Sequence, residues 1–75
     1  DYPHQAIETY RQVAQQLIDA RGRGNYAQAA RYFQRIRTIY HRLGEHDAWQ
    51  RLIKAARDHH ANLPALRDEL DKARL

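Results

Sequence analysis

The sequence predicts an all-α fold, a three- to four-helix up-down bundle, and three observations support this. Apolar residues recur at steps of three and four along most of the 75-residue chain, as they do on one face of an amphipathic helix. Alanine, leucine, arginine and glutamine dominate the composition, and all four are good helix formers. No segment alternates polar and apolar residues as a half-buried strand does. We therefore expect a single helical domain over residues 1–75.

The first helix is predicted at about residues 4–20. Pro3 favours a helix start, because the N–H group that proline lacks would have had no partner in a first turn. Gly22 and Gly24 are expected to end the helix. Its apolar residues form one amphipathic stripe. They are Ala6, Ile7, Tyr10, Val13, Ala14, Leu17 and Ile18.

The second helix is predicted at about residues 25–43, with Asn25 as its N-cap and Gly44 as the glycine that follows its end. On a helical wheel, its apolar residues fill about half of the circumference. They are Tyr26, Ala29, Ala30, Tyr32, Phe33, Ile36, Ile39, Tyr40 and Leu43. One neighbouring helix would need a narrower face, so we expect this helix to be central and to pack against two neighbours.

The remaining segment is predicted to be helical at about residues 47–62 and 63–74. Asp47 suits a first turn, because a carboxylate is favourable near a helix N-terminus. Pro64 should interrupt the helix, yet the apolar spacing continues through it. The stripe is Trp49, Leu52, Ala56, His59, Leu63, Leu66, Leu70 and Ala73. We therefore expect one long C-terminal helix with a kink or a short break near residues 62–64.

Positive charge is concentrated in the middle of the chain. The net charge of +4 divides into −2 over residues 1–20, +6 over residues 21–44 and zero over residues 45–75. The wheel places Arg37 inside the apolar arc, where a guanidinium must find a partner, with Glu8, Asp47 or Asp58 as candidates. The other five arginines are candidate nucleic-acid contacts in the turn and on the outer stripe of the second helix. They are Arg21, Arg23, Arg31, Arg35 and Arg42.

Residues for catalysis or metal binding are not expected. The chain contains no serine and no cysteine, which excludes the commonest nucleophiles and any cysteine-ligated zinc. Its only glycine-rich turn follows a helix rather than a strand, so it lacks the context of a phosphate-binding loop. No two of the five histidines have the i,i+4 spacing of a helical zinc pair, although His41 and His46 are expected to approach across the Gly44 turn. We therefore predict no enzyme, no cofactor and no metal site.

Aromatic residues offer candidate contacts for a protein partner. The chain has five tyrosines, one tryptophan and one phenylalanine. Tyr2, Tyr10 and Trp49 are candidates for an exposed protein interface, since tyrosine and tryptophan anchor such interfaces. The alternative for each is a place in the helical core. No apolar run has the length of a membrane span and no signal-peptide pattern occurs, so we expect a cytoplasmic protein without membrane contact.

Around the first turn the sequence reads Gly24-Asn25-Tyr26, followed by alanines at 29 and 30 and aromatic residues at 32 and 33. This arrangement resembles the turn and second helix of a tetratricopeptide motif, in which small residues lie where the helices cross. The resemblance implies a tetratricopeptide-like helical hairpin, here in one copy.

A second pattern of residues runs through most of the chain, from about residue 6 to residue 75. Its positions are Asn25, Tyr26, Ala29, Ala30, Arg31, Tyr32, Arg35, Ile39, Tyr40, Leu43, Gly44, Trp49, Leu52, Ile53, Arg57, His59, Leu66, Glu69, Leu70 and Leu75. The pattern resembles the helical C-terminal region of bacterial SWIM-type zinc-finger proteins. The resemblance implies a CxCx(n)CxH finger upstream, because none of its ligands occurs here, and a natural C-terminus at or near Leu75. It implies no role for individual residues of this helical region.

These observations predict a non-enzymatic protein-interaction or structural module at the C-terminus of a larger bacterial protein. The absence of methionine, even at position 1, also leads us to expect a segment of a longer chain. Its partner would be another protein or the upstream domains of its own chain. The alternative is an accessory nucleic-acid-binding domain that uses the basic stripe of the second helix.

Overall fold

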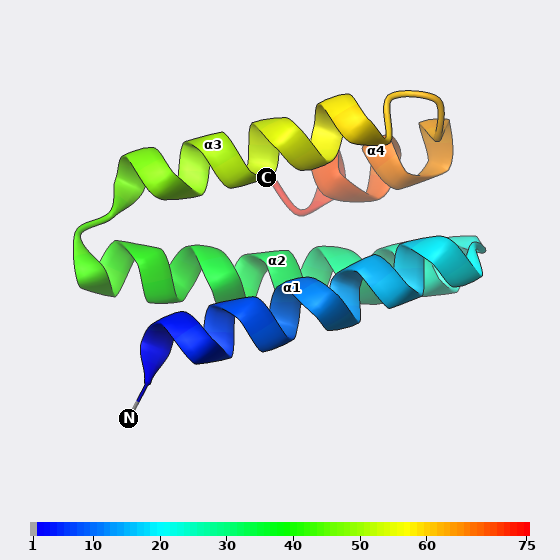
Figure 1. The fold of residues 1–75 in the computed structure, drawn as a ribbon. Coiled ribbons are helices and arrows are strands. Elements are labelled where there is room, and N and C mark those ends of the chain that lie inside the picture. Colours follow the sequence, from blue (N-terminus) through cyan, green and yellow to red (C-terminus); the bar gives the residue numbers. More distant parts are fainter. Residues whose placement is uncertain (1) are drawn as a thin grey trace.

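In the computed structural model, which describes residues 2–75, four helices follow one another in an up-down-up-down order (Figure 1). They are α1 (Pro3–Ala20), α2 (Arg23–Leu43), α3 (His46–His59) and α4 (Pro64–Lys72). Helix α2 packs against each of the other three helices, and its packing with α1 is the most extensive. The all-α bundle and the central position of α2 are therefore confirmed. None of the helices within residues 2–75 has both the length and the apolar character needed to cross a membrane.

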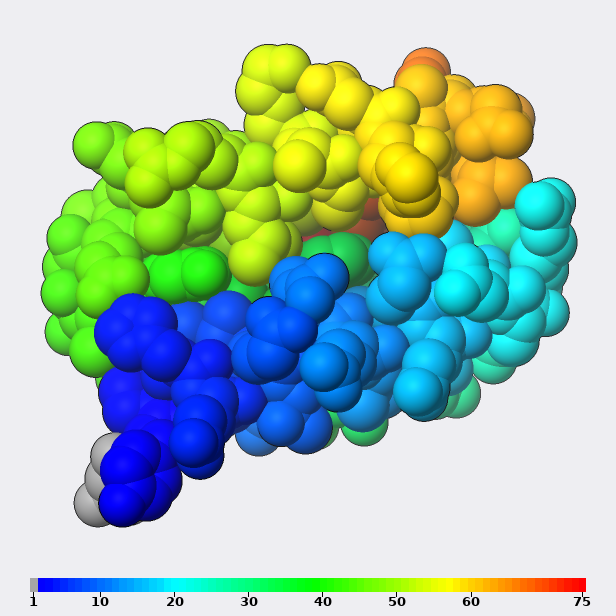
Figure 2. All heavy atoms as spheres, in the orientation of Figure 1, coloured from blue at the N-terminus to red at the C-terminus, as the bar shows by residue number. Residues whose placement is uncertain are grey.

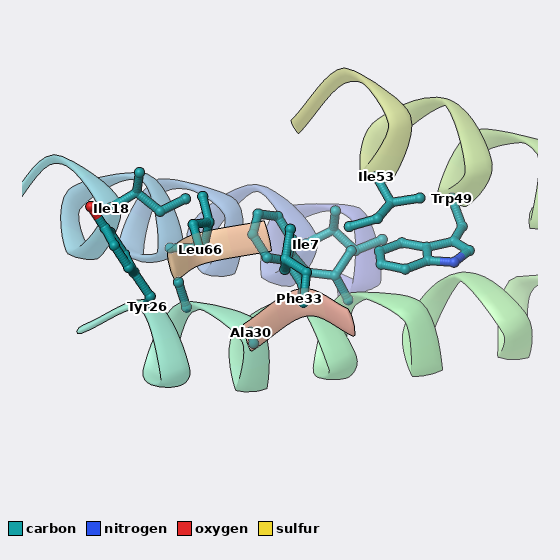
Figure 3. Packing of buried hydrophobic residues seen from close by; sticks show 12 residues of the cluster. Ile7, Ile18, Tyr26, Ala30, Phe33, Trp49, Ile53 and Leu66 are labelled. Carbon is teal, nitrogen blue, oxygen red and sulfur yellow. The ribbon is translucent and has the colours of Figure 1, made fainter. Parts of the chain in front are cut away.

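The core is a single apolar cluster, to which α2 contributes more residues than any other helix (Figure 3). Phe33 and Ile36 of α2 are only 4% and 0% exposed, which confirms that the wide apolar arc is covered from more than one side. The buried residues are Ile7, Ala14, Ile18, Tyr26, Ala29, Ala30, Phe33, Ile36, Trp49, Ile53, Leu66 and Leu70.

The turn between α1 and α2 differs from the prediction. Helix α1 ends at Ala20, but α2 begins at Arg23, so Gly24 lies inside α2 and Gly22, with a φ of 105°, is the residue that separates the helices. Asn25 is therefore not the N-cap of α2. Its side-chain amide instead donates a hydrogen bond to the carbonyl of Arg21 at 2.7 Å. Helix α2 therefore begins two residues before the predicted cap, with Gly22 in the N-cap position.

The end of α2 follows the prediction. Gly44 adopts a left-handed conformation with a φ of 70°, and its N–H group bonds back to the carbonyls of the last turn. A side chain is strained in this conformation and glycine is not, which is why glycine suits this position. Helix α3 then begins at His46, with Asp47 in its first turn as expected.

The expected long C-terminal helix is instead two antiparallel helices (Figure 1). Helix α3 ends at His59, residues 60–63 form a turn, and α4 starts at Pro64. Leu63 has a φ of −115° and a ψ of 84°, because the proline ring disfavours helical geometry in the residue before it. The continuous apolar spacing misled the prediction, since both helices use their apolar faces against the same core.

Three side chains hold the last three carbonyls of the chain. Gln34 and Arg37 of α2 donate to the carbonyls of Ala73 and Arg74 at 3.3 and 2.9 Å. Arg57 of α3 donates to the carbonyl of Leu75 and, at 2.9 Å, to the carboxylate of Asp71. The partner of Arg37 is thus a backbone carbonyl and none of the three predicted carboxylates. We call these three donors the C-terminal clamp.

Candidate functional site

The outer face of α2 carries exposed positive charge. Arg31, Arg35 and Arg42 all lie on the exposed side of the helix, opposite the buried arc, as predicted. Helix α2 contains no aspartate or glutamate over its entire length. Within residues 2–75, none of these three arginines forms an ion pair with a carboxylate. We call these three residues the basic face of α2.

The acids elsewhere are mostly paired with cations of their own helix or of a neighbour. The pairs are Arg11–Glu8, Arg23–Asp68, Arg23–Glu69, Lys54–Asp58, Arg57–Asp71, Lys72–Asp68 and Lys72–Glu69. Hydrogen bonds from Arg11 and Arg23 lower the pKa of the Glu8 and Asp68 carboxyls, respectively. Helix α2 carries four arginines without a carboxylate partner among residues 2–75, and the other unpaired arginines are spread over the rest of the fold, at Arg21, Arg51, Arg67 and Arg74.

Arg23 does not belong to this surface. It was predicted to lie in a turn as a nucleic-acid contact, but it occupies the first turn of α2 and contacts α4. Its guanidinium donates to Asp68 at 2.8 Å and to Glu69 at 2.9 Å. A phosphate would have to displace two carboxylates to reach it, so we exclude Arg23 from the candidate surface.

Arg21 is exposed at the turn between α1 and α2 and has an unusual backbone conformation. Its φ of 63° and ψ of 166° fall in a region that is occupied almost only by glycine. Such strain costs on the order of 1–3 kcal/mol in a residue with a side chain. The following Gly22 has a positive φ as well, so the whole turn would suit glycine.

Replacing Arg21 with glycine is therefore expected to stabilise the protein by about 1 kcal/mol, the relief of strain being offset in part by the greater freedom of glycine in the unfolded chain. Urea unfolding followed by circular dichroism measures this change. Replacing the exposed Arg31 with glycine is the control, and it should destabilise the protein by about 1 kcal/mol, because glycine is a poor helix former. A destabilised Arg21→Gly protein would contradict the strained backbone.

Tyr10, Tyr32 and Arg35 form a cluster across the seam between α1 and α2. The two tyrosine rings lie 5.7 Å apart, centroid to centroid, with their planes at 43°. The guanidinium carbon of Arg35 is 5.1 Å from the centroid of Tyr32 and 5.9 Å from that of Tyr10. Tyr10 is thus half-buried and lies beside Arg35, and its place in a protein interface stays a prediction. We call these three residues the tyrosine–arginine cluster.

The other two aromatic candidates for a protein interface differ in their exposure to solvent. Trp49 is only 3% exposed and belongs to the core (Figure 3). The prediction that it lies in an exposed interface is therefore wrong. Its indole has the area to fill the space between α3 and α2, and burial of that area outweighs any role at the surface. Tyr2 is 74% exposed and is the one large hydrophobic residue at the surface of residues 2–75. It borders a hollow of about 430 Å³ beside Ile39 and Leu43.

A hollow of about 540 Å³ lies between α1 and α3, with Phe33 of α2 in its lining (Figure 2). The other lining residues are Arg11, Gln15, Leu52, Ala55, Ala56, His59 and His60. No carboxylate is among them. Partial burial lowers the pKa of the His60 imidazole, and the neighbouring His59 lowers it further.

Histidines gather at the turn between α2 and α3. The rings of His41 and His46 meet edge to face, with their centroids 4.6 Å apart, which confirms that they approach across Gly44. His4 contacts both carboxylate oxygens of Glu45 at 3.0 and 3.1 Å and so ties the start of α1 to this turn. No group of three or more side chains able to hold a metal ion occurs in the described part of the chain.

Comparison with known proteins identifies one curated relative. The chain is 34% identical over 73 residues to the uncharacterized protein YwqB of Bacillus subtilis (strain 168). The alignment covers 97% of this chain but only 14% of that relative, so the chain spans about a seventh of its length. No protein-family model matches, and no solved structure matches.

Proposed function

We propose that this chain is a non-enzymatic binding module of a longer protein and that the basic face of α2 contacts nucleic acid. The observation that carries the proposal is the acid-free outer side of α2, where Arg31, Arg35 and Arg42 have no carboxylate partner among residues 2–75. Most carboxylates elsewhere are engaged by other cations. An anionic partner would therefore meet three unpaired arginines together on this face, on a helix without any carboxylate.

The spacing of the three arginines suits a phosphate backbone. Residues 31 to 42 extend over about 16 Å along the helix axis, at about 1.5 Å per residue. Guanidinium groups bind phosphate oxygens in a bidentate manner, and each such contact releases counterions from the nucleic acid. Binding should therefore weaken steeply as salt rises. Arg21, another predicted contact, is exposed in the turn that precedes α2.

Reversing the charge of Arg31 and Arg35 together, as Arg31→Glu with Arg35→Glu, is expected to abolish binding to labelled duplex DNA at low salt. Fluorescence anisotropy at several salt concentrations measures the affinity and its salt dependence. The midpoint of thermal unfolding should fall only slightly, because both side chains are exposed and the contact of Arg35 with the two tyrosine rings is worth about 0.5–1 kcal/mol.

The matched control makes the same change of net charge away from the basic face of α2, as Arg51→Glu with Arg67→Glu. Both of these residues are exposed and lie on α3 and α4. This control should keep most of the affinity. Failure of the unmodified chain to bind any nucleic acid at low salt, or an equal loss in the control, would refute the proposal.

Docking of a helix from a partner protein is a second candidate, and the hollow between α1 and α3 favours it. Its wall combines Phe33 and Leu52 with the small residues Ala55 and Ala56, which allow a helix to approach closely. Because Phe33, Leu52 and the two alanines give the hollow an apolar wall, the occupant we propose is an amphipathic helix that packs its apolar side into the hollow.

A photo-crosslinking side chain at position 55 tests this second candidate in cells that express the protein. Crosslinks are expected to map to one amphipathic helical segment, and a probe at the exposed Gln28, on the outer side of α2, is the control. Crosslinks scattered over unrelated segments would reject the candidate. A protein that crosslinks equally at both positions would reject it too.

Two finer assignments belong to the same proposal. We propose that α1 and α2 form a tetratricopeptide-like hairpin, which is supported by their extensive packing and by the buried Ala29 and Ala30. We also propose that the chain is the helical region of a bacterial SWIM-type zinc-finger protein. The much greater length of YwqB leaves room for such a finger outside the aligned region. This proposal fails if the longer protein lacks the CxCx(n)CxH pattern.

A further inference from the structure

We propose that the tyrosine–arginine cluster is a stacking site for an unpaired base, so that the basic face of α2 takes single-stranded nucleic acid in preference to duplex. This inference rests on the proposed function, which by itself requires only contacts to phosphate. The new element is a base-recognition site at Arg35, formed jointly by α1 and α2.

The guanidinium of Arg35 lies within 6 Å of the centroids of two aromatic rings, Tyr10 of α1 and Tyr32 of α2. Both rings are half-buried and pack against the core, so they are fixed in place. The Arg35 side chain itself remains exposed. An arginine that is attracted to two fixed rings loses less conformational freedom on binding than a freely moving one.

Such a group matches the chemistry of a nucleobase. Bases that are not stacked in a duplex bind to aromatic rings or to the plane of an arginine guanidinium. The guanidinium of Arg35, held against the two rings, offers its outer side to such a base. In a duplex each base is already stacked and paired, and its faces cannot reach this site. The cluster therefore favours a single strand.

The neighbouring arginines flank this site along the helix. Arg31 lies one turn before Arg35, about 6 Å along the axis, and Arg42 lies about 10 Å beyond it. Both side chains are exposed and have no carboxylate partner in residues 2–75. A strand lying along α2 would place a base at Arg35 while its phosphates meet Arg31 on one side and Arg42 on the other. The other bases of the strand need not contact the protein, so we expect the affinity to depend little on the base sequence.

The test replaces Arg35 with lysine, which keeps the charge but removes the planar guanidinium. The probe is a labelled oligothymidylate of about ten nucleotides, within the usual site sizes for single strands. We expect Arg35→Lys to weaken binding about fivefold or more, since stacking of one base is worth at least that. The matched control, Arg31→Lys, should change the affinity by much less. Duplex DNA and a base-free sugar–phosphate oligomer should bind both variants similarly.

A second variant tests the aromatic part of the site. Tyr10→Leu keeps an apolar side chain against the core and removes one ring, and Tyr40→Leu changes another half-buried tyrosine that Arg35 does not cover. Circular dichroism confirms that both variants are folded. Weaker single-strand binding of the first variant alone supports the site, and equal binding by both overturns it.

The outcomes separate this inference from the proposed function. If single strands and duplexes bind equally well and Arg35→Lys behaves like Arg31→Lys, the stacking site is refuted while contact with phosphates stands. If neither nucleic acid binds at low salt, both proposals are refuted. If an acidic polypeptide competes as well as the oligothymidylate, the surface recognises charge alone and the stacking site is again refuted.

Discussion

Replacing Phe33 with alanine is expected to unfold much of the protein. Phe33 is 4% exposed and lies on α2, the helix that contacts all the others. Truncation of a buried phenylalanine costs about 3–5 kcal/mol, from lost transfer free energy and from the cavity that remains. Small domains have total stabilities near the lower end of roughly 5–15 kcal/mol. Urea unfolding followed by circular dichroism measures the loss.

The control for Phe33 is Gln28→Ala, an exposed change on the opposite side of the same helix. It should alter the free energy of unfolding by no more than about 0.5 kcal/mol. If Phe33→Ala causes a loss as small as this control, then α2 is not the centre of the core. In that case burial of the apolar arc would no longer explain why the basic face of α2 points toward solvent.

Replacing Trp49 with alanine is expected to cost about 3–5 kcal/mol as well. Trp49 is 3% exposed and is the one tryptophan of the chain. Its loss removes the largest side chain with which α3 enters the core, so α3 should separate from α2 in the variant. Chemical denaturation monitored by circular dichroism measures the change. The fluorescence of the unmodified protein should show the emission maximum of a buried indole.

Gln50→Ala, next to Trp49 and exposed, is the matched control and should be nearly neutral. A small loss of unfolding free energy in Trp49→Ala, together with the emission of a solvent-exposed indole in the unmodified protein, would show that Trp49 lies at the surface. It would then again be a candidate for a protein interface.

The part of the fold that follows from local patterns could be predicted from the sequence. The wide apolar arc of α2 predicted that this helix is central. The residue type at Gly44 predicted the left-handed conformation that ends the helix. The outward direction of Arg31, Arg35 and Arg42 follows from the same wheel. These features depend on residues within one helix, where the period of 3.6 residues decides which side each residue takes.

The errors arose where a partner distant in sequence decides the outcome. Arg23 pairs with Asp68 and Glu69 of α4, which no pattern around residue 23 indicates. Arg37 bonds to a carbonyl near the C-terminus. No local pattern distinguishes the turn before Pro64 from a kink. The wheel of one helix also cannot show that Tyr10 of α1 comes to lie beneath Arg35 of α2.

The C-terminal clamp has a consequence for how the molecule opens. Helix α4 has nine residues, too few to persist as an isolated helix in water. Because Gln34, Arg37 and Arg57 hold the carbonyls that follow it, α4 cannot detach without leaving three donors on α2 and α3 without those acceptors. The amide protons of α4 should therefore exchange with solvent in the same cooperative opening as those of α2. A hydrogen-exchange experiment should find that the two helices open as one unit, whereas the short length of α4 alone would suggest that this helix frays independently.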